Sequence, residues 1–233
     1  LRCPHIQLLT QRQRRTSLPL MSSYIAERRQ EEKDRRRIEI VDAAEGLYKE
    51  LGWDAVTMDS VAKRARLSRA LVYVYFKDKQ ELHFAIAVRA MEALQKRFEE
   101  ACTRSKTGLE KIVAIGRAYM AYSQEFPHYF DACARLELHA PGASGPTPHE
   151  QLSLEPGRRV HEVVVAPLAL GQQDGTVRSD LGDPNVTSRV LWGFTHGIIQ
   201  IAMTKSEPLA CVGISVPVFT QHTLSVIHGM LGR

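Results

Sequence analysis

The chain has 233 residues, of which 44% are apolar and 24% are charged, and its formal net charge is +5. No apolar run approaches the roughly 20 residues that a membrane-spanning helix needs, so we do not expect a membrane protein. The four cysteines are scattered without a paired spacing, and neither a disulfide framework nor a zinc site is predicted. These features together favour a globular, cytoplasmic protein.

The charge is unevenly distributed along the chain. Residues 1–80 contain 17 basic and 11 acidic side chains, whereas residues 81–233 contain 14 basic and 15 acidic ones. A basic N-terminal part is what a phosphate-binding surface requires. A solvated basic tail with no ligand is the alternative interpretation.

The first residues have the composition of a disordered basic arm, which we place at residues 1–33. Position 1 is not methionine and Met21 is a natural start, so residues 1–20 are candidates for a non-native extension. A helix is then predicted from Asp34 to Leu51, where an apolar stripe recurs at helical spacing. Gly52 follows at the position where a left-handed helix cap is favoured.

Residues 57–76, TMDSVAKRARLSRALVYVYF, predict two short helices joined by a tight turn. Thr57 and Ser68 are each placed to cap a helix with a hydroxyl group. Val72 and Phe76 lie one helical turn apart and should face the first of the two helices. The outer face of the second helix is then formed by Arg69, Ala70, Leu71 and Tyr73. A short helix with its inner side pinned and a basic, aromatic outer side suits the DNA major groove.

Residues 57–82, TMDSVAKRARLSRALVYVYFKDKQEL, resemble the helix-turn-helix of TetR-type transcriptional regulators. The ungapped match to the family pattern includes Thr57, Ala62, Ala65, Ser68, Tyr73, Tyr75, Phe76, Lys79 and Leu82. The resemblance implies an all-α protein with a helix-turn-helix DNA-binding domain at 34–82 and an effector-binding and dimerisation domain at 83–233.

The resemblance also implies roles for individual residues. Phosphates would be held by Tyr75, Lys79 and the capping amides near Thr57 and Ser68, while Arg69, Ala70, Leu71 and Tyr73 would face bases. Arg69 is the best candidate for a guanine contact. The basic residues 35–37 would either follow the DNA or belong to a flexible lead-in.

Arg66 departs from the family pattern, which has glycine at this turn. The position often needs a positive φ, which costs a residue with a Cβ about 1 kcal/mol. Either a phosphate contact by Arg66 offsets this strain, or the turn differs from that of the family.

The rest of the sequence predicts only helices, with no convincing strand alternation. Helices are expected at about 79–103, 109–126, 127–139, 150–170, 184–205 and 217–231, and a loop at 140–148. The stretch at 171–184, GQQDGTVRSDLGDP, resembles a family connector that begins with a glycine helix stop and ends with Asp183 capping the next helix.

The C-terminal domain is expected to hold a pocket for a moderately apolar small molecule, as the resemblance implies. By position, the candidate lining residues are Tyr119, Tyr122, Phe130, Trp192 and His196. Trp192 and His196 lie one helical turn apart and can project together. Aromatic residues at helical spacing are equally typical of an ordinary core.

The last two helices are the predicted dimer surface. Gly193 and Gly197 would allow another helix to approach closely, and the candidate apolar contacts are Leu191, Ile198, Ile201, Leu224 and Ile227. The alternative is that these faces are buried within one subunit. A dimer would double the short site that one helix-turn-helix reads.

No motif for catalysis, metal binding or cofactor binding is present. The His-Glu pairs at 149–150 and 161–162 lack the second histidine of an HExxH site, and there is no glycine-rich phosphate loop. We therefore expect neither an enzyme nor a bound metal or cofactor. The predicted function is a homodimeric repressor that a small-molecule effector releases from a palindromic DNA operator; the alternative is a helical ligand-binding protein without specific DNA binding.

Overall fold

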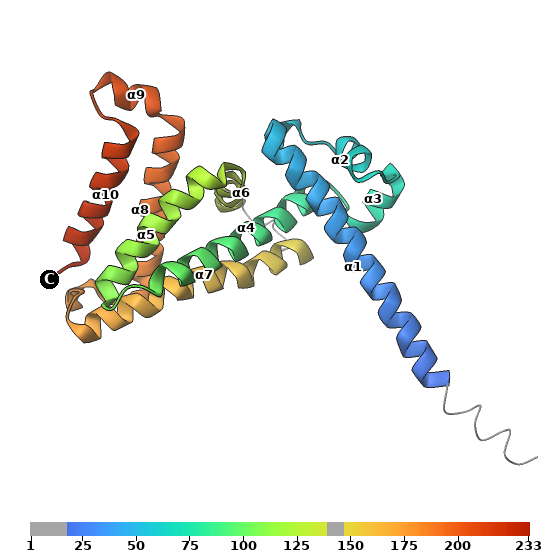
Figure 1. The fold of residues 1–233 in the computed structure, drawn as a ribbon, viewed down its shortest axis with the longest axis horizontal. Helices are drawn as coiled ribbons and strands as arrows, with labels where there is room; N and C mark the ends of the chain where they lie inside the picture. Colours follow the sequence, from blue (N-terminus) through green and yellow to red (C-terminus); the bar gives the residue numbers. More distant parts are fainter. Residues whose placement is uncertain (1–17, 139–146) are drawn as a thin grey trace, which may run out of the picture. The chain divides into compact units, whose positions relative to one another are not determined.

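The computed structural model describes residues 18–138 and 147–233, and over these residues it is built from helices. The one pairing of extended backbone there is an isolated bridge between Val177 and Gly232. The chain divides into two compact units, one up to Asp78 and one from Lys79 onward (Figure 1). The all-α prediction is confirmed. No helix within the described ranges is both long and apolar enough to cross a membrane.

The first unit contains α1 (Leu18–Leu51), a short 3-10 turn (Trp53–Ala55), α2 (Met58–Ala65) and α3 (Arg69–Tyr75). Helix α1 begins well before the predicted Asp34, so the expectation of a disordered arm is wrong for residues 18–33. Residues 1–17 of that arm lie outside the described residues. The added turns are exposed to solvent over residues 23–35, and ion pairs one turn apart, such as Arg36 with Glu32 and Glu39, support them.

The core of this unit lies between the C-terminal half of α1 and the two short helices. Val61 and Val72 are fully buried there, while the Tyr48 and Trp53 rings lie 5.1 Å apart. The apolar stripe predicted for residues 34–51 runs from Ile38 to Leu51, and the prediction is wrong at these two ends, since both side chains are more than half exposed. Ile38 precedes the stretch that packs on α2, and Leu51 ends the helix.

Two arginines tie α1 to the elements that follow it. Arg64 of α2 donates two hydrogen bonds to the Glu50 carboxylate, at 3.0 and 2.6 Å. The Arg37 guanidinium lies 4.6 Å from the centre of the Phe76 ring, at the end of α3. Phe76 is fully buried. The first contact holds α2 against α1, and the second holds the end of α3 against α1, so both short helices are tied to the long one.

The second unit contains α4 (Lys79–Cys102), α5 (Gly108–Glu125), α6 (Pro127–Glu137), α7 (Pro148–Asp174), a 3-10 turn (Ser179–Leu181), α8 (Pro184–Thr204), α9 (Ser206–Cys211) and α10 (Val216–Leu231). Helix α9 was not predicted from the sequence. The predicted loop at 140–148 falls largely on residues 139–146, which lie outside the described ranges.

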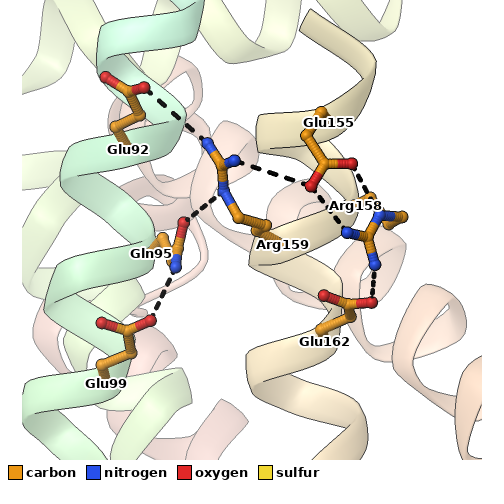
Figure 2. Close-up of polar contacts among 7 residues, drawn as sticks. All are labelled: Glu92, Gln95, Glu99, Glu155, Arg158, Arg159 and Glu162. Carbon is orange, nitrogen blue, oxygen red and sulfur yellow. Dashed lines mark hydrogen bonds and ion pairs between the residues drawn. The ribbon is translucent and has the colours of Figure 1, made fainter.

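Helices α4 and α7 run side by side, and α5, α6 and α8 pack on one or both of them (Figure 1). Helix α10 packs on α5 and α8, and α9 packs on α8 and α10. Polar side chains link the two helices at their exposed edge (Figure 2). Arg159 of α7 donates to the Gln95 side chain of α4 at 3.2 Å and lies 3.9 Å from the Glu92 carboxylate. The same arginine also faces Glu155 on its own helix, at 3.7 Å. A single cation thus bridges both helices, beside the apolar contacts that bury Leu94 and Val160.

Helix α7 extends past its predicted end because Gly171 is not a stop. Gly171 packs against Gly108 at the start of α5, where a Cβ on Gly108 would lie 2.1 Å from the Gly171 nitrogen. The helix ends instead at Gly175, whose φ of 77° is in the left-handed region. The predicted cap at Asp183 is confirmed, since its carboxylate accepts from the Asn185 amide at 2.8 Å.

Candidate functional site

Helices α2 and α3 each begin at a residue whose hydroxyl group caps the helix. Thr57 caps α2 by accepting from the Ser60 amide at 3.1 Å, and Ser60 accepts from the Thr57 amide at 3.0 Å. Ser68 caps α3 by accepting from the Leu71 amide at 3.2 Å. These capping bonds satisfy amides that the helix itself leaves without a partner.

Arg66 lies in the left-handed region, with φ 57° and ψ 38°. The Leu67 amide donates to the Ala62 carbonyl at 2.9 Å across this residue, which is the hydrogen bond of a Schellman helix end. The turn therefore keeps the backbone form that glycine prefers, although an arginine occupies it. Arg66 therefore has the positive φ that was expected to strain a residue with a Cβ, and the turn has the backbone conformation expected for the family.

The outward side of α3 is exposed at every position that the sequence assigned to it, except that Leu71 is half-buried. Arg69, Ala70 and Tyr73 are exposed, while Val72 on the opposite side is fully buried. Of the candidate phosphate-binding residues, Tyr75 is half-buried, and Lys79 is the first residue of α4 and belongs to the second unit.

Val74 is an outward-facing residue of α3 that the sequence reasoning missed. Its side chain is 76% exposed, more than that of any other large apolar residue of this short helix. The signal was available, because Val74 lies one turn after Ala70 and so shares its face.

Arg69 contacts two side chains of its own unit, Asp59 and Tyr73. Its Nε lies 3.0 Å from an oxygen of Asp59 on α2, and the guanidinium lies 5.5 Å from the centre of the Tyr73 ring. The hydrogen bond to Tyr73 and the charge of Asp59 raise the pKa of Arg69, so it stays cationic. The two side chains of the ion pair are each more than 60% exposed, and water screens such pairs strongly.

The aromatic residues predicted to line a pocket meet in the second unit. The Tyr119 and Trp192 rings stack 5.0 Å apart, and the Phe130 and His196 rings stack 4.6 Å apart. The Tyr119 hydroxyl lies 2.8 Å from Nδ1 of His196. Burial raises the pKa of Tyr119 and lowers the pKa of His196, which favours the neutral form of both groups, and the tautomer of His196 decides which of the two donates the hydrogen bond.

Beside this cluster lies a small apolar cavity of about 30 Å³. Tyr119 and Trp192 line it together with apolar residues of α4, α5, α7, α8 and α10 that the sequence analysis did not assign to a pocket, among them Phe98, Ile112, Ile115, Leu191 and Ile227. Tyr122 is not part of the lining, because its hydroxyl donates to the Ala90 carbonyl of α4 at 2.7 Å.

The predicted dimer residues divide into two groups. Leu191, Leu224 and Ile227 are buried in the core of the unit, so they do not form an exposed face. Gly193 is exposed, Gly197 and Ile198 are half-buried, and Ile201 is 41% exposed. A Cβ added at either glycine would meet nothing within 4 Å. The exposed side of α8 therefore has open space where a second helix would fit.

A sequence model described as "Bacterial regulatory proteins, tetR family" matches residues 40–86. This range contains the buried half of α1, the α2–α3 pair and the start of α4. Over these residues the chain is similar to TetR-type regulatory proteins. The match covers the capped, exposed α3 described above, and the TetR-type pattern is therefore carried by the part of the chain that presents this helix.

Among curated relatives, the uncharacterized HTH-type transcriptional regulator YhgD of Bacillus subtilis is 34% identical over 68 residues. That alignment covers 29% of this chain and 35% of YhgD, so the chain spans only about a third of that relative. The fatty acid metabolism regulator protein of Bacillus subtilis is 22% identical over 186 residues, which are 76% of this chain and 89% of the relative.

The fold is shared along most of the chain with solved TetR-type structures. The crystal structure of the transcriptional regulator FadR from Bacillus subtilis in complex with stearoyl-CoA superposes with a TM-score of 0.63 at 18% identity. The superposition covers 83% of this chain and 98% of that structure. The likeness at this identity concerns the fold.

Proposed function

We propose that the protein is a sequence-specific DNA-binding transcriptional regulator and that α3 is its recognition helix. The observation that carries this proposal is the presentation of α3: Ser68 caps it, Val72 and Phe76 anchor it, and its opposite face is open to solvent. A DNA target would place the protein in the cytoplasm.

The exposed face of α3 supplies groups suited to base edges. Arg69 has the planar donor pair that recognises guanine, while Ala70 and Val74 offer apolar surface for a thymine methyl group. Leu71 and Tyr73 flank them on the same helix. Arg66, Tyr75, Lys79 and the amides at the capped starts of α2 and α3 would contact phosphates, which fixes the register on the duplex.

We propose that two copies associate through the exposed side of α8. Val186, Val190, Gly193, Gly197 and Ile201 follow one another at intervals of three or four residues and so form one stripe. Val186 and Val190 are each 62% exposed, although they are apolar. A two-fold dimer through this stripe would read a palindromic operator with half-sites about one helical turn, or 34 Å, apart.

The effector is proposed to enter the second unit beside Tyr119 and Trp192. The cavity there is apolar, and one relative is named as a regulator of fatty acid metabolism while a structural neighbour is described in complex with stearoyl-CoA. We therefore propose a ligand with an extended apolar chain. A cavity of about 30 Å³ holds little more than one water molecule, so binding requires the aromatic cluster to separate.

Effector binding would shift the dimer from a conformation that binds the operator to one that does not. The protein would then be a repressor that its ligand releases from DNA. Helix α4 is suited to transmit this change because its first residue follows the helix-turn-helix unit and its body packs on α5, α6 and α7. The alternative is a helical ligand-binding protein without specific DNA binding.

Fluorescence anisotropy with DNA flanking the protein's own gene, at two salt concentrations, tests the proposal. Tight binding to one fragment is expected, with weaker binding by Tyr73→Ala. A matched control is Tyr24→Ala, which removes an exposed tyrosine from α1. Weak binding to every fragment with the same salt dependence would refute sequence-specific recognition.

A further inference from the structure

A groove of about 760 Å³ lies at the end of the second unit where α5 begins and α10 ends. Its walls are the connection between α4 and α5, the first half of α5, Thr176 and His228. Figure 1 shows the start of α5 and the C-terminal end of α10 at this same end of the unit. A volume of this size is in the range of small-molecule sites.

The groove is lined by an excess of positive charge. Arg104 and Lys106 lie in the α4–α5 connection, Arg117 lies two turns into α5, and Glu110 is the one carboxylate of the lining. Of the side chains described, none forms an ion pair or hydrogen bond with the Arg104 or Arg117 guanidinium or with the Lys106 ammonium. By contrast, Arg64, Arg97 and Arg178 of the same chain each have a carboxylate partner.

The carboxylates near the groove are already committed to backbone amides. Glu110 accepts from the amides of Lys106 and Thr107 at 2.9 and 3.1 Å, and these bonds lower its pKa. Asp174 accepts from the Gly108 amide at 2.8 Å and from Thr176, which likewise lowers its pKa. Both acids thus stabilise the start of α5, and an incoming anion would be held by the side chains of the three cations.

The floor of the groove is apolar, since Leu109, Val113 and Ala114 line it between the cations. Guanidinium groups recognise phosphate oxygens with two parallel hydrogen bonds, and a diphosphate can reach several cations at once. We propose that this groove binds a phosphate-bearing small molecule of nucleotide size, with its phosphates on Arg104, Lys106 and Arg117 and its less polar part on the apolar floor.

This site is separate from the proposed effector cavity but lies on the neighbouring side of the same helix. Ile112 and Gly116 of α5 line the cavity, whereas the adjacent Val113 and Arg117 line the groove. The proposal stands whether or not the protein binds DNA, because it rests on contacts within the second unit alone.

Isothermal titration of the full chain at low ionic strength, with adenosine diphosphate and with inorganic pyrophosphate, tests the proposal. Adenosine diphosphate is expected to bind more tightly than pyrophosphate, and Arg117→Glu should weaken both by about tenfold or more. Lys96→Glu is the control, because it makes the same change of charge at an exposed position of α4 outside the groove.

Three results would overturn the proposal. The first is that neither adenosine diphosphate nor pyrophosphate binds, and the second is that Arg117→Glu and Lys96→Glu weaken binding of the probes equally. The third is that Arg117→Glu loses DNA binding while its binding of adenosine diphosphate is unchanged. The last would assign the groove to nucleic acid. Circular dichroism melting checks that Arg117→Glu is folded, and Arg104→Glu, in the connection rather than in a helix, gives a second test should that variant unfold.

Discussion

The Arg69 guanidinium on α3 is bound to the Asp59 carboxylate on α2, with Nε 3.0 Å from the acid oxygen. The side chain with the best chemistry for guanine is therefore held by an acid of its own unit. On the proposed DNA complex, a base would have to replace Asp59 as the partner of Arg69. Asp59 therefore opposes DNA binding in two ways: it forms an ion pair with Arg69, and its negative charge repels the phosphates.

Asp59→Asn is expected to raise operator affinity, since Arg69 becomes available and a negative charge is removed. Fluorescence anisotropy on the operator measures the change. Asp34→Asn, which removes one exposed charge from α1, controls for the general effect of charge. If the two variants bind equally well, the ion pair does not restrain Arg69.

Arg69→Ala is expected to lose sequence discrimination. The ratio of its affinity for the operator to its affinity for an operator variant that lacks one guanine should fall about tenfold or more. Lys79→Ala should instead weaken binding to all sequences and reduce the salt slope by about one, as loss of a single phosphate contact does. Titrations of both proteins against operator variants at several salt concentrations separate these roles. An unchanged base preference in Arg69→Ala would contradict its role in reading bases.

Arg66→Gly is expected to stabilise the protein by about 1 kcal/mol, because glycine adopts the φ of 57° at this turn without a Cβ clash. Urea unfolding measures this change. Arg66→Ala removes the guanidinium and keeps the Cβ, so it should give no such gain. DNA titrations of the same pair show whether the arginine contributes a phosphate contact, which both variants would lose.

Gly197→Leu is expected to abolish the proposed dimer while leaving the subunit folded. A Cβ at Gly197 meets nothing within 4 Å of the chain, so the larger side chain would project only into a partner helix. Light scattering gives the mass, and Ala121→Leu on the exposed side of α5 is the matched control. A wild-type protein that is monomeric at micromolar concentration would already refute the dimer.

Acid is expected to destabilise the second unit. Burial lowers the pKa of His196 and of His161 below the ordinary value of 6.5. The unfolded chain therefore takes up protons more readily, and the free energy of unfolding should fall as the pH drops below about 6.5. Urea titrations from pH 8 to pH 5 measure this dependence.

His196→Gln should flatten that pH dependence, and His222→Gln, which changes an exposed histidine of α10, controls for the general effect of replacing a histidine. Equal pH slopes in the wild type and in His196→Gln would mean that His196 is protonated as readily in the folded state as in the unfolded one.

The sequence by itself determined the local structure of the DNA-binding unit. Hydroxyl caps at Thr57 and Ser68, the spacing of Val72 and Phe76, and the conflict at Arg66 all depend on bonds within a few residues. The same holds for Asp183 and for the helical character of the chain, which local patterns indicate directly. Pattern alone did not reveal that α1 starts at Leu18 or that α7 passes Gly171.

Only the tertiary structure decided which apolar residues are exposed and which charges are paired. Leu191, Leu224 and Ile227 have the same spacing as surface residues of their helices, yet contacts with other helices bury them. The ion pair of Arg69 with Asp59 joins two helices, and the cationic groove joins segments more than a hundred residues apart. Burial and charge pairing of this kind depend on how the helices pack. A periodic pattern in the sequence indicates which face of a helix is apolar, but it does not indicate which other helix covers that face.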